Sequence, residues 1–409
     1  MLTFGMVNDD IIGVILSYVI DKKHDFCHIR KVSRRYDRIA LTTKKMMIAY
    51  KVNLLIEKNM IDIFDKYMGI VVCKQNMSAL QRLNNITHVQ LKYDYNDDAN
   101  FADILPENTK HLYFSFYFNK CISNFPKHLT FLDLGYMFDK EIDCLPNTLT
   151  HLICSYMFNK PVDNLPNSLT YLKFGDKFNQ SVDNLPNSLK YIYFGSNFNK
   201  SVDKLPNNVE TLIFGKCFCQ SVDNLPNKLQ NITFGCGFNR SVDNLPNTVK
   251  SITFGKVAYF GSCFDKSLDK LPSGLIKLHF NPTSIFNQSI DKLPSSLRYL
   301  YLGINFNKSI DALPKELRYL HLDHSYYFNH PIDKLPNKLM YLSLCSNYNN
   351  KVENLPPNLE YIFFGKSFNQ DIDKLPKSVK QITFEYGYKF EKNKRRMPKN
   401  KNIKICFLK

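Results

Sequence analysis

LPNSLTYLKFGDKFNQSVDN, residues 165–184, is one copy of a unit that recurs along most of this 409-residue chain. A proline marks each copy, and of the 13 intervals between successive prolines ten are 20 residues, two are 22 and one is 26. These prolines stand at positions 106, 126, 146, 166, 186, 206, 226, 246, 272, 294, 314, 336, 356 and 376. A fixed period of this length is the signature of a repeat architecture.

Each unit carries the pattern of one short β-strand. Leu172 and Phe174 alternate along the chain and would share one face of that strand. Tyr171 and Lys173 would then share the opposite face, and Gly175 permits the bend that ends the strand. Proline and glycine bracket every copy and leave no window for an amphipathic helix, so each unit is predicted to be a strand followed by a compact return.

A unit of about 20 residues cannot bury its own apolar side chains, so the copies must stack to form a stable core. We therefore expect a right-handed, leucine-rich-repeat-like solenoid whose strands pair in parallel at about 4.8 Å. It would span residues 83–388, with about 14 repeats preceded by a degenerate entry coil at Ile86, Val89 and Leu91. Residues 389–409 form a basic tail, in which Ile403, Ile405 and Phe407 could add a capping strand.

Two polar residues recur at fixed places in the unit. Asn follows the aromatic residue in ten units, as at Asn159 and Asn179, and a ladder of such side chains can satisfy buried backbone groups of the turns. Asp stands three residues before proline in 12 of the 14 units. Like charges about 5 Å apart repel each other, so we expect these carboxylates to face solvent or to cap local N–H groups rather than to hold a metal.

The repeat resembles the FNIP family of leucine-rich-like repeats. FNKPVDNLP (158–166) and FNHPIDKLP (328–336) carry the resemblance, which covers about residues 100–388. It implies a leucine-rich-repeat-type solenoid that binds proteins. Because FNIP repeats are known mainly from social amoebae and from giant viruses that infect amoebae, the resemblance also implies a host–virus interaction.

Residues 5–45 follow a different pattern, with Ile11, Ile15, Leu16 and Val19 on one face of a predicted helix. The segment from MVNDDIIGVILSYV to KVSRRYDRIA resembles an F-box, although Val7-Asn8 replace its Leu-Pro and Tyr36 replaces its Trp. The resemblance implies binding to the Skp-type adaptor of a cullin-RING ubiquitin ligase. The contact residues that it implies are Val7, Ile11, Ile15, Leu16, Val19 and Val32. Residues 46–82 are predicted to form a helical linker and N-terminal cap.

The strand residues that face away from the core are candidates for binding a target protein. They lie five and seven residues after each proline, and many of them are tyrosines. Exposed aromatic side chains at regular spacing resemble an interface, because tyrosine supplies contact area at a low cost in side-chain entropy. The alternative is that these tyrosines only stabilise stacking between strands. The candidates are Tyr171, Tyr191, Tyr193, Tyr299, Tyr301, Tyr319, Tyr341 and Tyr361.

Several other classes of function are disfavoured. No catalytic motif and no cofactor motif occurs, and His279, His321, His324 and His330 form a weak cluster that is better explained as surface than as a metal site. The net charge is +17, but residues 389–409 carry +8 of it, so nucleic-acid binding along the nearly balanced repeats is unlikely. No apolar stretch approaches the ~20 residues of a membrane span. The 11 scattered cysteines and the lack of a signal-peptide pattern indicate free thiols and a location in the cytoplasm or the nucleus. If the protein is viral, this would be the cytoplasm or the nucleus of the host cell.

The sequence therefore predicts a non-enzymatic substrate-recognition adaptor of an SCF-type cullin-RING ubiquitin ligase. In this hypothesis the F-box docks a Skp-type adaptor, the repeats bind an unknown protein substrate, and no cofactor is needed. The alternative is a protein-interaction solenoid unrelated to ubiquitination, whose N-terminal helices act as a cap.

Overall fold

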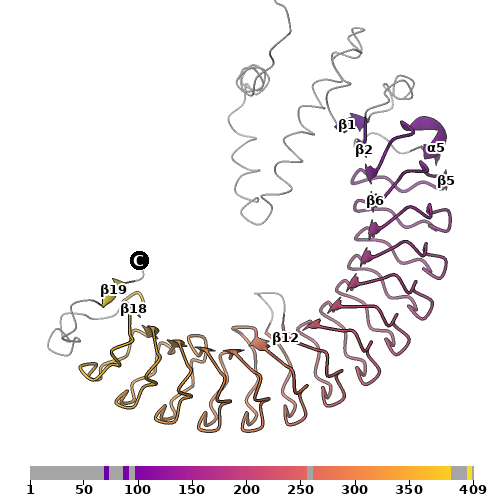
Figure 1. The fold of residues 1–409 in the computed structure, drawn as a ribbon. Helices are drawn as coiled ribbons and strands as arrows, with labels where there is room; N and C mark the ends of the chain where they lie inside the picture. The colour runs from indigo at the N-terminus through magenta and orange to yellow at the C-terminus, as the bar shows by residue number, and fades with distance from the viewer. Residues whose placement is uncertain (1–68, 73–85, 92–96, 256–260, 388–402, 408–409) are drawn as a thin grey trace, which may run out of the picture. The chain divides into compact units, whose positions relative to one another are not determined.

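The computed structural model describes residues 69–72, 86–91, 97–255, 261–387 and 403–407 (Figure 1). The F-box-like module at 5–45, with its six implied contact residues, lies outside the described residues, as does most of the 46–82 linker. The described chain forms two units, Met1–Ser155 and Tyr156–Lys409.

Unit 1 contains a run of parallel strands. β1 pairs with β2, β2 with β4, β4 with β6, and β6 with β7. A short helix, α5, lies between two further strands, β3 and β5, which pair with each other in parallel. The bounds are β1 (Gly69–Val72), β2 (His88–Leu91), β3 (Ala99–Asn100), α5 (Phe101–Ile104), β4 (His111–Tyr113), β5 (Ile122–Asn124), β6 (Phe131–Asp133) and β7 (His151–Ile153).

Unit 2 contains one strand per repeat, and each strand pairs in parallel with the next along the chain. Within this unit the strands line the inner side of the curved ribbon, and the returns lie on the outer side (Figure 1). The bounds are β8 (Tyr171–Lys173), β9 (Tyr191–Tyr193), β10 (Thr211–Ile213), β11 (Asn231–Phe234), β12 (Ser251–Phe254), β13 (Lys277–Phe280), β14 (Tyr299–Tyr301), β15 (Tyr319–His321), β16 (Tyr341–Ser343), β17 (Tyr361–Phe364), β18 (Gln381–Phe384) and β19 (Lys404–Phe407).

The strand register confirms the predicted stacking. Leu172 lies opposite Ile192, and Ile192 lies opposite Leu212, so equivalent residues of successive repeats are direct neighbours. The register also survives the 26-residue interval, because Ile252 of β12 lies opposite Leu278 of β13.

The core of unit 2 consists of columns of equivalent apolar side chains. Leu172 and Phe174 are fully buried, and so are their equivalents in the following repeats. From Phe178 to Phe328, each phenylalanine of the FN pair stacks on the next with ring centroids 6.1–6.3 Å apart. No repeat completes these columns alone, which is why the fold requires stacking.

The asparagine ladder is also confirmed. The side-chain Oδ1 of Asn159 accepts a hydrogen bond of 2.9 Å from the backbone N–H of Asn179, and Asn179 does the same for Asn199. Each amide side chain thus satisfies a backbone donor one repeat further on. The Asp row faces solvent as expected, and Asp183 forms an exposed ion pair of 3.5 Å with Lys204.

The N-terminal end of the array differs from the sequence prediction, whereas the C-terminal end agrees with it. The predicted entry coil is present as β2, but β1 adds one more strand before it, within the segment expected to be a helical linker. Residues 69–72 lack the Leu-Pro mark, so the repeat search could not find them. The expected capping strand is present as β19, where Ile405 lies opposite Ile382. All nine cysteines in the described part of the chain are free thiols.

Candidate functional site

The side chains that face away from the core on β8–β18 form a continuous strip along the inner side of unit 2, here called the inner strip. Strand geometry fixes this orientation, because alternate residues of a strand point to opposite faces. In β8, for example, Leu172 is fully buried, whereas Tyr171 is half-buried and Lys173 is exposed. All eight tyrosines predicted from the sequence lie on the inner strip. Seven are half-buried, and Tyr361 is 40% exposed.

The first group of tyrosines lies on β8 and β9. Tyr171 and Tyr191 stack with ring centroids 4.5 Å apart and an interplanar angle of 7°. The Lys173 ammonium lies 5.4 Å from the centroid of the Tyr193 ring, a cation–π distance. Burial raises the pKa of Tyr191 to about 12, so this hydroxyl remains protonated and can donate a hydrogen bond at neutral pH.

The second group lies on β14–β17 and is more extensive. Tyr299 stacks on Tyr319 at 4.7 Å, and Tyr319 stacks more loosely on Tyr341 at 6.4 Å. Beside this row, His321 stands between Tyr301, at 4.1 Å, and Tyr341, at 4.5 Å. Tyr361 follows on β17, opposite Tyr341 in the register.

Small polar side chains separate the two groups. Thr211 on β10, Asn231 on β11 and Ser251 on β12 occupy the position that tyrosine holds on β9 and, beyond Lys277 of β13, on β14. The inner strip of unit 2 thus has two aromatic regions with a polar centre, as the sequence predicted. The stacking of the rings agrees with the alternative hypothesis, in which the tyrosines only stabilise the packing between strands. The rings nevertheless remain partly exposed, so a binding partner could contact them.

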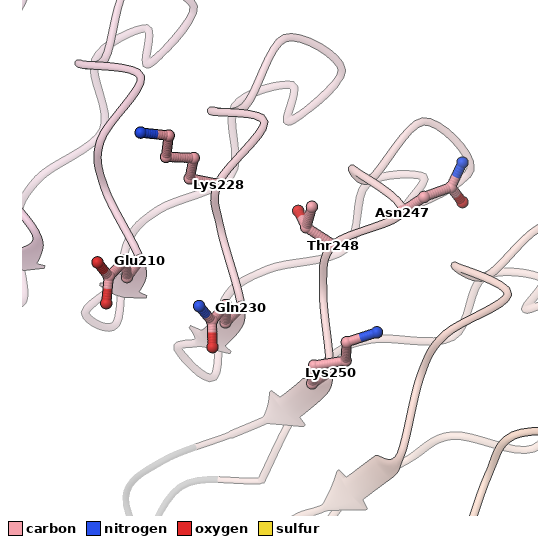
Figure 2. Close-up of a pocket in the computed structure, with 6 residues that line it drawn as sticks. All are labelled: Glu210, Lys228, Gln230, Asn247, Thr248 and Lys250. Carbon is pink, nitrogen blue, oxygen red and sulfur yellow. The ribbon is translucent and has the colours of Figure 1, made fainter.

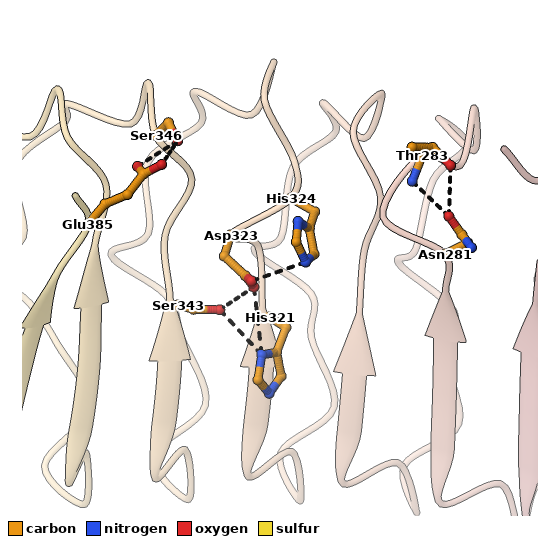
Figure 3. A network of polar contacts seen from close by, with 8 residues as sticks. All are labelled: Asn281, Thr283, His321, Asp323, His324, Ser343, Ser346 and Glu385. Carbon is orange, nitrogen blue, oxygen red and sulfur yellow. Dashed lines mark hydrogen bonds and ion pairs between the residues drawn. The ribbon is translucent and has the colours of Figure 1, made fainter. Parts of the chain in front are cut away.

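The structure reveals a polar cluster that the sequence analysis did not find as a unit (Figure 3). The carboxylate of Asp323, just after β15, accepts a hydrogen bond of 2.6 Å from the Ser343 hydroxyl. Its oxygens also lie 3.6 Å from Nδ1 of His321 and 3.4 Å from Nε2 of His324. Two histidines of the weak cluster are therefore brought together, whereas His330 lies apart, with Nε2 3.2 Å from the Asn307 carbonyl oxygen.

The electrostatics of this cluster keep the carboxylate ionised. Burial alone would raise the pKa of Asp323, but the contacts with His321 and Ser343 and the nearby charge of His324 outweigh it and lower the pKa to about 2. On β13, burial and the nearby charge of Lys277 lower the pKa of His279 to about 4, so that imidazole is neutral at pH 7.

The position of Asp323 in its repeat is the sequence signal that could have revealed this cluster, because Asp323 departs from the repeat consensus. This residue stands nine residues after Pro314, where Gly175 stands after Pro166. Asn281 and Glu385 occupy the same place in their repeats (Figure 3). Asn281 accepts hydrogen bonds from Thr283, two residues further on, and Glu385 accepts them from the hydroxyl of Ser346, 39 residues earlier in the chain. A departure from the repeat consensus at the end of a strand therefore marks each of these polar sites.

A hollow of about 550 Å³ lies on unit 2 at the side where the chain enters the strands (Figure 2). The six residues that line it are of polar types and include one carboxylate and two ammonium groups. It has none of the ring stacking of the inner strip. The residues that line it are Glu210, Lys228, Gln230, Asn247, Thr248 and Lys250.

Unit 1 has its own row of rings at the equivalent strand positions. His88 stacks on His111 at 4.1 Å, His111 on Phe131 at 5.4 Å, and Phe131 on His151 at 6.3 Å. Burial and the neighbouring His88 and His151 lower the pKa of His111 to about 4. This row was not among the predicted site residues, because the sequence analysis selected tyrosines.

No group of histidine, cysteine or acidic side chains in the described parts of the chain has an arrangement that could hold a metal ion. Among the described helices, none reaches the length and apolarity of a membrane span.

The parallel strands, one per repeat, and the columns of leucine and phenylalanine define a leucine-rich-repeat-like solenoid, a class of fold that typically serves as a scaffold for protein interactions. The chain belongs to the FNIP repeat family. The family model described as "FNIP Repeat" matches residues 100–137, 138–177, 158–184, 178–217, 221–257, 286–325, 328–367 and 347–387.

The chain is also similar to several solved structures. The crystal structure of CroV588, described as a novel circular LRR protein, is 32% identical and aligns with a TM-score of 0.66 over 79% of this chain. The aligned region is 53% of that protein, so this chain spans about half of its length. YopM from Yersinia enterocolitica WA-314 is 16% identical, with a TM-score of 0.43, and covers 78% of this chain and 80% of its own. The functional domain of InlJ from Listeria monocytogenes is 13% identical, with a TM-score of 0.41, and covers 63% of each chain. No match was found among curated proteins.

Proposed function

We propose that this protein is a non-enzymatic recognition subunit that captures a partner protein on the inner strip of unit 2. The observation that carries the proposal is the second tyrosine group, in which Tyr299, Tyr319 and Tyr341 lie half-exposed on adjacent strands in register. Tyrosine is enriched in protein interfaces because it offers a large, rigid surface with a polar end. Tyr319 stacks on Tyr299 on one side and on Tyr341 on the other, and these contacts hold the rings in place before binding, which lowers the entropy lost on association.

The test is a double substitution, Tyr299→Ala with Tyr319→Ala, in the full chain. Proteins that co-purify from host-type cells would be quantified by mass spectrometry for the wild type and the variant. We expect the specific partner to be lost while the unfolding midpoint changes by only a few degrees. A matched control is Tyr326→Ala with Tyr327→Ala, because these rings are 48% and 58% exposed but lie outside the inner strip.

The two outcomes separate binding from stabilisation. Loss of the partner with the control pair as well would show that capture does not depend on the inner strip. A large loss of stability in the strip variant would show that these tyrosines serve strand stacking, which is the alternative role.

A finer role follows from the sequence of residues 5–45. We propose that this segment is an F-box and that the protein delivers its captured partner to an SCF-type cullin-RING ligase, in the cytoplasm or nucleus of a host cell. The support is the match of the segment to the F-box pattern, with Ile15 and Leu16 on the apolar face of its first predicted helix. Transfer of ubiquitin would be catalysed by the ligase and not by this chain.

The finer role is tested with full-length protein that carries Ile15→Asp and Leu16→Asp. We expect co-purification of a Skp-type adaptor with the wild type and its loss with this variant, because a charge on the apolar face opposes burial against the adaptor. Lys22→Asp, in the polar break of the same segment, is the control for added negative charge. Equal recovery of the adaptor with all three proteins, or no recovery with any, would favour a binding solenoid unrelated to ubiquitination.

A further inference from the structure

Asp323 is the acidic residue of the second aromatic region. The outward positions of β8–β18 hold two lysines, Lys173 and Lys277, but no aspartate or glutamate. Asp323 follows β15 by two residues, and its carboxylate points toward Ser343 and His321 of the strip (Figure 3). It therefore adds one negative charge to a surface that is otherwise aromatic and neutral or basic.

The Asp323 carboxylate retains capacity to accept hydrogen bonds. A carboxylate offers about four lone-pair sites. Among the described residues, Ser343 supplies the one short hydrogen bond, at 2.6 Å, while the histidine nitrogens stand farther off, at 3.4 and 3.6 Å. The Asp323 side chain is 31% exposed, so a donor from outside can reach it. With a pKa of about 2, the group is charged at any physiological pH.

A stack of rings runs past this carboxylate. Tyr301, His321 and Tyr341 follow one another on β14, β15 and β16, with centroid separations of 4.1 and 4.5 Å. The Asp323 charge raises the pKa of both tyrosines, after the larger effect of burial, which places it within electrostatic reach of the two ends of the stack. Lys277 already lies over the Tyr301 ring, with its ammonium 5.5 Å from the centroid, and His321 lies between the two tyrosines, so the Tyr341 end of the stack is the end left for an incoming cation among the described residues.

We propose that Asp323 and the ring stack of Tyr301, His321 and Tyr341 form a receptor for an arginine side chain of the captured protein. Guanidinium fits both parts of the site, because its planar face stacks on aromatic rings and its fork of N–H groups binds a carboxylate. Lysine offers a compact, strongly hydrated charge that gains less from stacking. This inference rests on the proposed function, since it names the chemistry by which the same strip recognises its partner.

The experiment is selection of a phage-displayed library of random peptides on the full-length protein, followed by sequencing. We expect arginine to be enriched at one position of the selected peptides with the wild type, and this enrichment to be lost with Asp323→Asn. Asp291→Asn is the matched control, because Asp291 also accepts a hydrogen bond from a serine hydroxyl, at 2.8 Å from Ser289, but is exposed on a return. It should leave the enrichment unchanged.

A selected peptide then provides a double-mutant cycle, in which two peptides are compared on the same protein so that a uniform loss of affinity in the variant cancels. The peptide and its Arg→citrulline analogue, which keeps the shape but loses the charge, are titrated against wild type and Asp323→Asn. We expect the analogue to bind the wild type about tenfold or more weakly, as for the loss of a hydrogen bond between charged groups. The two peptides should bind Asp323→Asn within about twofold of each other, which assigns the loss to this pair.

The results separate this inference from the proposed function. Peptides that depend on Tyr299 and Tyr319 but show no preference for arginine, or prefer lysine equally or acidic residues, would overturn the arginine receptor and leave the binding strip intact. An unchanged citrulline effect in Asp323→Asn would also overturn it. A selection that yields no peptide sensitive to either set of substitutions counts against both proposals.

Discussion

Tyr348→Phe is predicted to stabilise the protein, although it removes a polar group and adds nothing. Tyr348 occupies the phenylalanine place of the FN pair and is fully buried. Its ring continues the column of phenylalanines and lies 6.0 Å from that of Phe328. Its hydroxyl is buried and has no hydrogen-bond partner among the described residues. Burial also raises the pKa of Tyr348, so the hydroxyl remains neutral.

The magnitude follows from what the hydroxyl loses on folding. In the unfolded chain it is hydrated, and in the folded chain it exchanges that water for apolar contacts. Such an unsatisfied buried group costs about 1–3 kcal/mol. Because the two rings have the same shape, Tyr348→Phe should raise the free energy of unfolding by about 1–3 kcal/mol, less whatever the cavity left by the oxygen costs.

Urea unfolding of the full chain, followed by circular dichroism, measures the effect. The midpoint should rise while the slope with urea stays constant, which indicates a change in stability rather than in the extent of unfolding. Phe328→Tyr is the matched control, because it buries a hydroxyl at the same place one repeat earlier and should destabilise by a similar amount. A loss of more than about 1 kcal/mol in Tyr348→Phe would refute the reasoning, since it would mean that the hydroxyl has a favourable partner.

Two further substitutions test the stacking of the repeats, and a third tests the effect of the buried His279 on stability at low pH. Gly215→Ala should lower the free energy of unfolding in urea by at least about 1–3 kcal/mol, because its Cβ would stand 2.0 Å from the Gly195 carbonyl oxygen of the preceding repeat. A midpoint equal to that of the wild type would contradict this close approach. Asn199→Ala should cost about 0.5–1.5 kcal/mol, since its Oδ1 accepts from the backbone N–H of the next repeat at 3.0 Å, and faster hydrogen exchange at that N–H would confirm the cause. The pKa of His279 falls from 6.5 to about 4 on folding, so the unfolded state binds a proton before the folded state does. The stability of the wild type should therefore decline as pH falls from 6.5 to 4, and His279→Gln should reduce this decline. Parallel pH profiles of wild type and variant would exclude that contribution.

The repeats of the fold could be predicted because one pattern decides several features at once. The Leu-Pro period sets the length of the repeat, and the alternation at Leu172 and Phe174 sets which side of the strand is buried. Equivalent residues must then become neighbours, as Leu172 and Ile192 do. β1 escaped prediction because Gly69–Val72 belongs to a coil without the Leu-Pro mark, and its pairing with β2 is visible only in three dimensions.

The candidate site was predictable only in part. The positions of the eight tyrosines followed from strand alternation, since every one of them faces away from the core. The cluster around Asp323 did not follow, because it joins Ser343 of one repeat to His321 and His324 of another, across 19–22 residues of sequence. The repeat consensus gives only the residues that the repeats have in common, whereas this cluster consists of residues that differ from the consensus in two repeats.

The constant register across repeats of unequal length has a consequence for how this protein can change. The interval from Pro246 to Pro272 is six residues longer than the common interval of 20, yet Thr233, Thr253 and His279 still lie opposite one another on β11, β12 and β13. Insertions in the returns therefore leave the spacing of the strand side chains untouched. Such a molecule can acquire new loops on one side, by mutation or by design, while the strand side keeps its geometry, so that two surfaces of a single chain are free to diversify independently.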